Sequence, residues 1–142
     1  MSGKNQKNRG TILMRMVYPD RREKSAYTID YADLYRKGYR GVIFDIDNTL
    51  VPHGAPATKE AAAFFASLRE TGFSTCLLSN NQKPRVAPFA DAVGSIYIEN
   101  AHKPSVKNYQ EACRRMGIKE EQAVFVGDQL FTDVYGAKRT GL

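Results

Sequence analysis

The chain has 142 residues, 42% hydrophobic and 25% charged, values typical of one globular domain with a single core rather than a disordered or fibrous chain. No apolar run approaches the roughly 20 residues of a membrane-spanning helix, and arginines interrupt the hydrophobic patch near the N-terminus, which argues against a signal peptide. Cys76 and Cys113 lie in apolar segments without a CxxC partner, so we expect neither a disulfide nor a zinc site. These features predict a cytoplasmic protein.

The net charge of +6 lies entirely in residues 1–40, which hold ten Lys/Arg and four Asp/Glu, whereas residues 41–142 hold eleven of each. A basic segment beside a neutral domain predicts attraction to an anionic surface, either phospholipid headgroups or nucleic acid, which salt would screen. The alternative is a solvated tail that aids solubility. We interpret residues 1–28 as a basic, partly disordered N-terminal extension and residues 29–142 as the folded core.

Short apolar runs alternate with helical patterns along the rest of the chain, which predicts a βαβ arrangement with a mostly parallel sheet. The elements expected in chain order are a helix at 29–37, a strand at 41–46, a helix at 58–71, a strand at 73–79, a helix near 85–92, a strand at 95–98, a helix from Pro104 to Gly117, a strand at 123–126 and a helix at 132–140. The sheet is expected to lack its closing strand.

Polar side chains follow each of the four predicted strands, where ligands bind in open α/β sheets. The four clusters are Asp45 with Asp47, Ser79-Asn80-Asn81, Lys103, and Gly127-Asp128 through Asp133. Two carboxylates about 4 Å apart repel by about 4 kcal/mol at an effective dielectric near 20, so this edge requires a cation. Oxygen ligands without His or Cys favour Mg²⁺, and a phosphoryl group between Mg²⁺ and a lysine would let a carboxylate approach phosphorus.

These residues, in this order, resemble the four motifs of the haloacid dehalogenase (HAD) superfamily. The matching positions are Asp45-x-Asp47-x-Thr49, Ser79, Lys103-Pro104 and Gly127-Asp128-x-x-x-x-Asp133. The resemblance covers residues 41–136, about two thirds of the chain, and four ordered motifs at predicted strand ends are far more specific than one. It implies a three-layer, Rossmann-like core.

The resemblance implies that Asp45 is the nucleophile, which forms an aspartyl-phosphate, and that Asp47 is the general acid and then the base. It implies that Asp45, the backbone carbonyl of Asp47 and Asp128 hold Mg²⁺. Asp133 would lie in the second shell, orienting Lys103 or a metal-bound water. An aspartate two residues after the nucleophile favours phosphate hydrolysis over dehalogenation.

The substrate phosphate is expected to contact Thr49, Ser79, Asn80 and Lys103. Each residue alone has an ordinary structural alternative, because Thr49 could cap or turn the chain and Ser79 could form an ST-turn. A domain with the HAD fold but without turnover therefore stays open as an alternative. Neither His53 nor His102 is expected to be a ligand. We interpret His102, next to Lys103, as an exposed loop histidine, and contact with the substrate is the alternative.

HAD enzymes with small substrates usually carry a cap domain after the first motif or between the second and third. Only 8 residues separate Thr49 from Thr58, and 23 separate Ser79 from Lys103, so neither insertion is present. An open site suits phosphate on a large anionic substrate such as a lipid surface, a protein or a polynucleotide, unless a second copy of the chain acts as a lid.

Within the superfamily, the runs 41–52, 79–81 and 127–133 resemble the capless YqeG group of bacterial phosphatases, which is similar to mitochondrial phosphatidylglycerophosphate phosphatases. This implies a lipid phosphate as substrate, with residues 1–40 in peripheral contact with an anionic membrane. A protein or nucleic-acid phosphatase of the same fold is the alternative, with nucleic acid the less favoured partner. Relatives continue past Leu142 with a further strand, so a C-terminal truncation is expected.

Five tyrosines of the N-terminal part are interleaved with basic residues. They are Tyr18, Tyr27, Tyr31, Tyr35 and Tyr39. Such tyrosines could stack on bases or lie at a lipid interface, and more often they pack a helix onto its domain.

Overall fold

The computed structural model describes residues 25–101, 106–128 and 131–135, in which a five-stranded sheet forms the centre of an α/β domain. The strand order is β3-β2-β1-β4-β5, and every pairing is parallel except that of β4 with β5. The strands are β1 (Gly41–Phe44), β2 (Ser74–Leu78), β3 (Ile96–Ile98), β4 (Ala123–Val126) and β5 (Phe131–Asp133). The predicted α/β fold with a mostly parallel sheet is confirmed.

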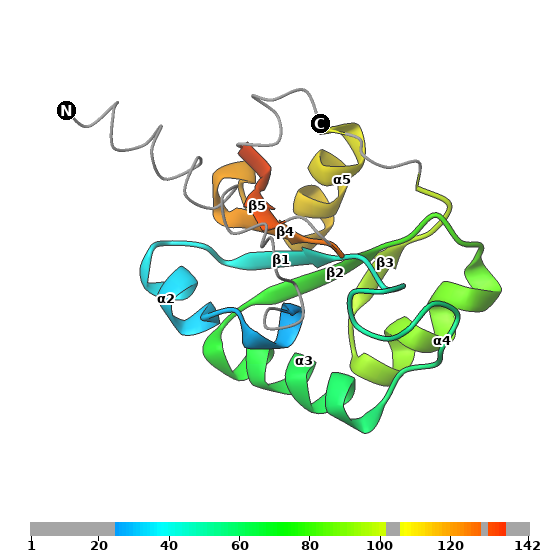
Figure 1. Ribbon diagram of the computed structural model, residues 1–142. Helices are drawn as coiled ribbons and strands as arrows, with labels where there is room; N and C mark the ends of the chain where they lie inside the picture. Colours follow the sequence, from blue (N-terminus) through cyan, green and yellow to red (C-terminus); the bar gives the residue numbers. More distant parts are fainter. Residues whose placement is uncertain (1–24, 102–105, 129–130, 136–142) are drawn as a thin grey trace.

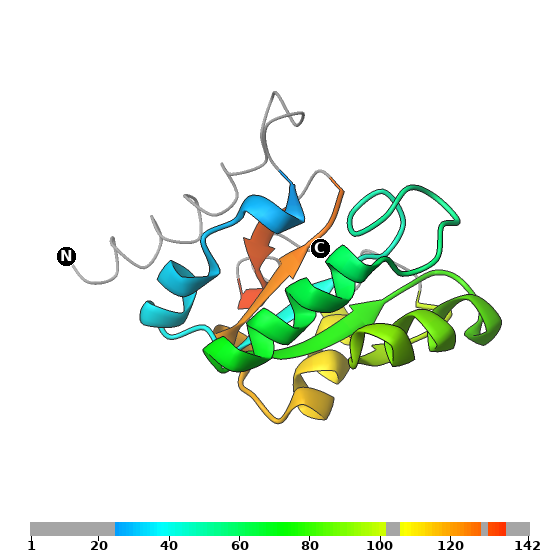
Figure 2. The same ribbon diagram turned by 90° about the horizontal axis from the view of Figure 1, so that it is seen from below.

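Helices cover both faces of the sheet, with α2, α3 and α4 on one face and α5 on the other (Figures 1 and 2). Their bounds are α2 (Tyr31–Arg36), α3 (Lys59–Thr71), α4 (Lys83–Val93) and α5 (Val106–Met116), with 3-10 turns η2 (Ala26–Thr28) and η3 (Glu120–Gln122). The predicted ends of α3 are confirmed, because the Thr58 hydroxyl accepts a hydrogen bond from the Ala61 N–H and Gly72 adopts the left-handed conformation. In the part of the chain that the structure describes, no helix is long and apolar enough to cross a membrane.

Each face of the sheet packs its own hydrophobic core, because the central strands are buried on both sides. On the α3 side, the rings of Phe44 and Phe65 lie 5.2 Å apart between centroids. On the α5 side, Ile43 packs in the same cluster as Tyr109 and Phe125, whose ring centroids are 5.1 Å apart. Burial on both faces explains why the strands read as continuous apolar runs.

The two cysteines belong to the core on the α5 side. Cys76 and Cys113 are buried free thiols, and burial raises the pKa of each to about 12. Both therefore stay protonated at neutral pH and act in packing.

Residues 25–28 pack against the core, although the sequence analysis places them in the N-terminal extension. The Tyr27 hydroxyl donates a 2.6 Å hydrogen bond to the Leu50 carbonyl, and its ring lies 4.9 Å from that of Phe64. The Tyr31 hydroxyl donates a 2.6 Å bond to the carbonyl of Ala26, which is itself buried. Packing therefore continues across the predicted boundary after residue 28.

The other tyrosines in this part of the chain also contact the domain. The Arg40 guanidinium lies 3.7 Å from the ring centroid of Tyr35, and Tyr39 is 1% exposed. Packing onto the domain, rather than stacking on bases or lipid, is what Tyr27, Tyr31, Tyr35 and Tyr39 do here. Tyr18 lies outside the described residues.

The segment after β4 differs from its prediction. Residues 131–133 form β5, which pairs antiparallel with β4, so the helix predicted from Thr132 is wrong at its start. Phe131 opposes Val126 and is 3% exposed, which shows that pairing with β4 and burial decide the local structure here. The sheet therefore has a fifth strand that the sequence analysis did not predict.

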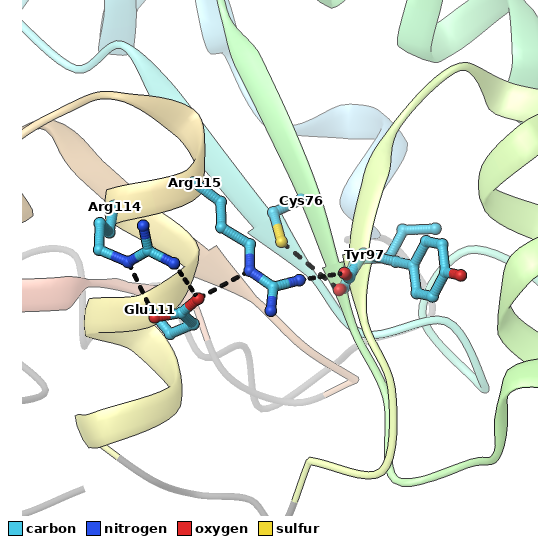
Figure 3. Close-up of polar contacts among 6 residues, drawn as sticks. Cys76, Tyr97, Glu111, Arg114 and Arg115 are labelled. Atoms are coloured by element: carbon cyan, nitrogen blue, oxygen red, sulfur yellow. Dashed lines mark hydrogen bonds and ion pairs between the residues drawn. The ribbon is translucent and has the colours of Figure 1, made fainter.

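Strand β3 forms one edge of the sheet, called the outer edge below. Here Arg115 of α5 donates a 3.1 Å hydrogen bond to the Tyr97 carbonyl (Figure 3). Glu111 Oε2 lies 2.8 Å from Arg115 Nε and 2.6 Å from Arg114 Nη2. A hollow of about 810 Å³ lies along this edge, lined by residues 95–99 and Arg115. It contains none of the predicted catalytic residues.

Candidate active site

The carboxyl ends of β1, β2 and β4 lie together at one edge of the sheet, as their parallel register requires (Figure 1). Asp45 directly follows β1, and its N–H donates a 3.1 Å hydrogen bond to the Val126 carbonyl at the end of β4. Ser79 directly follows β2, and its N–H donates a 3.1 Å bond to the Ile98 carbonyl of β3. The predicted meeting of these strand ends is confirmed.

The Asp45 carboxylate lies against the backbone of Gly127. A Cβ added at this glycine would come within 3.1 Å of Asp45 Oδ2 and 2.9 Å of the Phe125 ring, so a larger residue would displace one of them. Asp128 follows and, with residues 48–52, lines a hollow of about 440 Å³. The first and fourth motifs therefore share one site.

The turn after Asp45 is held by buried apolar side chains on either side of its polar residues. Ile46 and Leu50 are buried and joined by a 2.9 Å hydrogen bond from the Leu50 N–H to the Ile46 carbonyl. Asn48 has a φ of 62° and donates a 2.7 Å backbone bond to the Val51 carbonyl. Asparagine tolerates this left-handed conformation better than most residues, which explains why it can stand at the turn.

Asp47 is held by three hydrogen bonds from three different segments. Its Oδ1 accepts 2.8 Å bonds from the Gly54 N–H and from Arg85 Nη2, and its Oδ2 accepts a 2.9 Å bond from Asn81 Nδ2. The Asp47 and Arg85 side chains are 18% and 21% exposed. Gly54 has a φ of 79°, a conformation that lets its N–H point at the carboxylate and that favours glycine.

Opposing effects act on the pKa of Asp47. Partial burial raises it, but the Gly54 hydrogen bond, the bond and charge of Arg85 and the charge of His53 together outweigh burial, so the pKa is lowered. Asp47 is therefore an anion at neutral pH in the protein without substrate. His53 itself is exposed.

The second motif forms a tight turn around Ser79, which is 3% exposed. The Ser79 hydroxyl accepts a 3.0 Å hydrogen bond from the Asn81 N–H, which is the ST-turn that the sequence analysis kept as an alternative. Asn80 is exposed at the tip of this turn. The turn places the Asn81 side chain within reach of Asp47.

The Thr49 hydroxyl is buried and has no hydrogen-bond partner among the described residues. A buried hydroxyl without a partner costs about 1–3 kcal/mol, so such a group calls for an explanation. Thr49 also lines the hollow shared with Asp128. Binding of a phosphate oxygen in that hollow would satisfy the hydroxyl.

Lys103 and Asp133 are the remaining predicted contributors. Lys103 and the neighbouring His102 lie outside the described residues. Asp133 lies in β5 opposite Val124, and its carboxylate accepts a 3.2 Å hydrogen bond from the Tyr39 hydroxyl. Tyr39 precedes β1 whereas Asp45 follows it, and the antiparallel course of β5 places Asp133 opposite Val124 rather than at the carboxyl end of β4. The second-shell role of Asp133 stays a prediction.

The donors at the shared edge fit a hard divalent cation. Asp45 and Asp128 would supply carboxylate oxygens and Asp47 a backbone carbonyl, the oxygen donors that Mg²⁺ prefers. The missing side chain of Gly127 leaves the approach to Asp45 Oδ2 open. Within the described ranges, no group of three or more His, Cys, Asp or Glu side chains could hold a metal ion, so this set depends on the backbone carbonyl.

Sequence reasoning missed Asn81, Gly54 and Arg85 as residues around Asp47. One signal for Arg85 was available, because α4 begins with Lys83 and Arg85 in its first turn and has no acidic residue there. Basic residues are disfavoured at a helix N-terminus by the helix dipole, so their presence suggests an anionic partner. The 2.8 Å bond to Asp47 identifies one.

Comparison with known proteins shows what the chain is similar to. The model of the haloacid dehalogenase-like hydrolase family matches residues 54–141. A Bacillus subtilis protein named "Probable phosphatase YqeG" is 37% identical over 131 residues, which cover 92% of this chain and 76% of that protein. The chloroplastic/mitochondrial phosphatidylglycerophosphate phosphatase 1 of Arabidopsis thaliana is 27% identical over 89% of this chain and 39% of its own length.

Among solved structures, the cobalt-bound deoxy-D-mannose-octulosonate 8-phosphate phosphatase of Haemophilus influenzae superposes with a TM-score of 0.55. The two chains are 13% identical, and the match covers 63% of this chain and 58% of that one. At this identity the likeness concerns the fold alone.

Proposed function

The chain belongs to the haloacid dehalogenase-like hydrolase family, and we propose that it hydrolyses phosphate monoesters with Asp45 as nucleophile and Mg²⁺ as cofactor. The observation that carries the proposal is the closeness of the Asp45 carboxylate to Gly127, the residue before Asp128. Asp128 lines one hollow with residues 48–52, and Asp47 is fixed two residues after Asp45. A phosphatase is the enzyme class that its relatives support.

In the proposed reaction, an Asp45 carboxylate oxygen attacks phosphorus and the ester P–O bond breaks, which gives an aspartyl-phosphate. The leaving oxygen takes a proton from Asp47, whose pKa must rise when the anionic phosphate binds beside it. Water then attacks the phosphorus and gives a proton to Asp47, and the bond from Asp45 to phosphorus breaks to release inorganic phosphate.

Asp45, Asp128 and the Asp47 carbonyl would hold Mg²⁺, whose charge would offset the repulsion between the attacking carboxylate and the phosphate. Thr49, with its buried hydroxyl, would donate to a phosphate oxygen, and the proposal keeps Ser79, Asn80 and Lys103 as further contacts. Asp133, hydrogen-bonded to Tyr39, is kept in the proposal as a second-shell residue that would orient Lys103 or a metal-bound water.

We propose a large anionic substrate, in particular a lipid phosphate such as phosphatidylglycerophosphate. Three observations favour it. The loop from β1 to α3 is too short for a cap domain, the net positive charge lies in residues 1–40, and the Arabidopsis relative acts on such a lipid by its name. Residues 1–40 would hold the protein against an anionic membrane by attraction that salt weakens.

The test is release of inorganic phosphate from a generic aryl phosphate, measured with Mg²⁺, with EDTA, and for the Asp45→Asn variant. We expect turnover only when the wild-type protein is supplied with Mg²⁺. Equal rates in all three conditions would refute the proposed enzymatic activity.

The substrate class needs a second experiment, in which phosphatidylglycerophosphate vesicles are compared with phosphopeptides and 3′-phosphorylated DNA at low and high salt. A lipid preference that salt weakens is expected, and a preference for peptide or DNA would replace the lipid proposal.

A further inference from the structure

Arg85 forms an ion pair that differs from the others recorded between described residues. Its Nη2 lies 2.8 Å from Asp47 Oδ1, across 38 residues of sequence, whereas the remaining pairs join residues three or four apart in one helix. Both side chains are at most 21% exposed, so solvent screens this pair less than a surface pair. The pair connects the turn after β1 to the first turn of α4.

The contacts on Asp47 leave its two carboxylate oxygens in different situations. Oδ1 accepts two hydrogen bonds, from the Gly54 N–H and Arg85, whereas Oδ2 accepts one, from Asn81. Donors on both oxygens restrict rotation of the carboxylate plane. Oδ2 keeps more free acceptor capacity than Oδ1 and is therefore the oxygen better suited to carry a proton.

Arg85 is in turn held in place by its surroundings. Its guanidinium lies 5.7 Å from the ring centroid of Phe89, which is 2% exposed and lies one turn further along α4. With Phe89, Pro84 and Pro88, Arg85 lines a hollow of about 330 Å³ between α4 and the loop that contains Gly54. A planar guanidinium whose position is restricted by a helix and an aromatic ring can orient a carboxylate more tightly than a flexible lysine can.

We propose that Arg85 is a positioning residue that orients the Asp47 carboxylate so that Oδ2 faces the oxygen of the leaving group. This inference rests on the proposed function, in which Asp47 donates a proton to that oxygen. A misplacement of about 1 Å can cost about 10²-fold in rate, so loss of one fixed contact on Oδ1 should be measurable. Asn81, on Oδ2 itself, assists in the same orientation.

The test compares two substrates with different needs for a proton. An aryl phosphate such as p-nitrophenyl phosphate releases a stable phenolate, whereas an alkyl phosphate such as glycerol 3-phosphate releases an alkoxide unless the acid protonates it. The quantity compared is kcat/KM, which reports the steps up to departure of this group. The variants are Arg85→Met, Arg85→Lys and Asn81→Ala, and Arg114→Met is the matched control, because Arg114 is also a helical arginine paired with a carboxylate.

Arg85→Met is expected to lower kcat/KM about 10²-fold for the alkyl phosphate and less than about 5-fold for the aryl phosphate. Arg85→Lys should restore part of the loss, Asn81→Ala should show the same selectivity, and Arg114→Met should leave both substrates unchanged. Arg85→Lys and Asn81→Ala carry the test if Arg85→Met does not fold.

Equal losses on both substrates would overturn the proposal, because they would mean that Arg85 binds phosphate or stabilises the fold. The proposed function fails separately, if the wild-type protein hydrolyses neither substrate or if Asp45→Asn retains the wild-type rate. With an active wild type that depends on Asp45, unselective loss in the Arg85 variants refutes the positioning role alone.

Discussion

Two regions of this protein each hold a carboxylate that accepts hydrogen bonds from arginine, yet their surroundings differ. Beyond the carboxyl ends of the strands, the side chains of Asp47 and Arg85 are mostly buried, and their ion pair joins two distant segments. At the outer edge, Glu111 holds Arg114 and Arg115 on the exposed surface of α5 (Figure 3). Local pairs form wherever helical spacing allows, whereas a buried pair between segments requires the whole fold to place it.

Position, rather than pKa, decides which of the two carboxylates can serve in chemistry. The pKa is lowered for both Asp47 and Glu111 by hydrogen-bonding partners, so a lowered pKa does not distinguish them. What distinguishes Asp47 is its position two residues from Asp45 and beside the hollow lined by residues 48–52 and Asp128. The predictions below test this contrast.

The largest expected effect comes from removing the acid. Asp47→Asn keeps the shape of the side chain but cannot donate or accept the proton, so kcat/KM for an alkyl phosphate should fall about 10²- to 10⁴-fold. Glu111→Gln is the same change at the outer edge and should leave this value unchanged. Steady-state kinetics on both variants checks this prediction. Equal kcat/KM values for Asp47→Asn and Glu111→Gln would contradict a catalytic role that is specific to Asp47.

The second effect concerns the space beside Asp45. Gly127→Ala would place a Cβ 3.1 Å from Asp45 Oδ2 and 2.9 Å from the Phe125 ring, so the nucleophile or the ring must move. We expect about a 10- to 100-fold loss of kcat/KM on alkyl and aryl phosphates alike, because the attacking atom is shifted in both reactions.

Gly38→Ala is the matched control for Gly127→Ala. Among the described residues, apart from its two chain neighbours, no atom lies within 4 Å of a Cβ at Gly38. Its φ of 104° disfavours alanine, so stability should fall by about 1–2 kcal/mol while activity stays. Thermal denaturation together with kinetics separates the two variants. An active Gly127→Ala protein would show that Asp45 tolerates the added methyl group.

A smaller effect is expected at the buried hydroxyl of Thr49. Thr49→Val removes a group that has no partner among the described residues, so the melting temperature should stay the same or rise. Activity should nevertheless fall about 10- to 100-fold, the worth of one hydrogen bond to a charged phosphate. A parallel loss of stability and activity would instead assign Thr49 a structural role.

The smallest effect is the acid dependence of stability at the outer edge. Hydrogen bonds from Arg114 and then Arg115 lower the pKa of Glu111 from 4.5 to about 2. Because the folded-state pKa is depressed, its stabilising contribution is present above pH 4.5 and is lost as the pH falls toward 2. Glu111→Gln should therefore flatten the fall of melting temperature in this window, by at most about 3 °C because the group is exposed. An unchanged slope would show that the pair contributes nothing.

Much of the fold could be predicted from the sequence, because its elements are marked by local signals. The strand predicted at 41–46 forms as β1 (Gly41–Phe44), directly before Asp45, and α3 begins after Thr58 and ends before Gly72 as its caps require. Continuous apolar runs of this kind occur in strands buried on both faces, and the carboxyl ends of parallel strands meet by necessity. Asp45 and Asp128 could be assigned to one site on that basis.

The remaining features depend on contacts between distant residues. Residues 131–133 carry no strong strand pattern and become β5 because they pair with β4. Asp133 consequently lies beside Tyr39, a position that motif spacing could not indicate. Arg85 lies 38 residues from Asp47, and only the fold brings α4 to the turn after β1.

The central claim is that Asp45 attacks phosphorus, and trapping of the phosphorylated enzyme tests it most directly. The protein is mixed with an aryl phosphate and Mg²⁺, quenched, and reduced with borohydride, which converts an aspartyl-phosphate to homoserine. Mass spectrometry should find homoserine at position 45, and no modification in the Asp45→Asn variant or in the presence of EDTA. Turnover by the wild-type protein with homoserine at another aspartate, or undiminished turnover by Asp45→Asn, would contradict the claim.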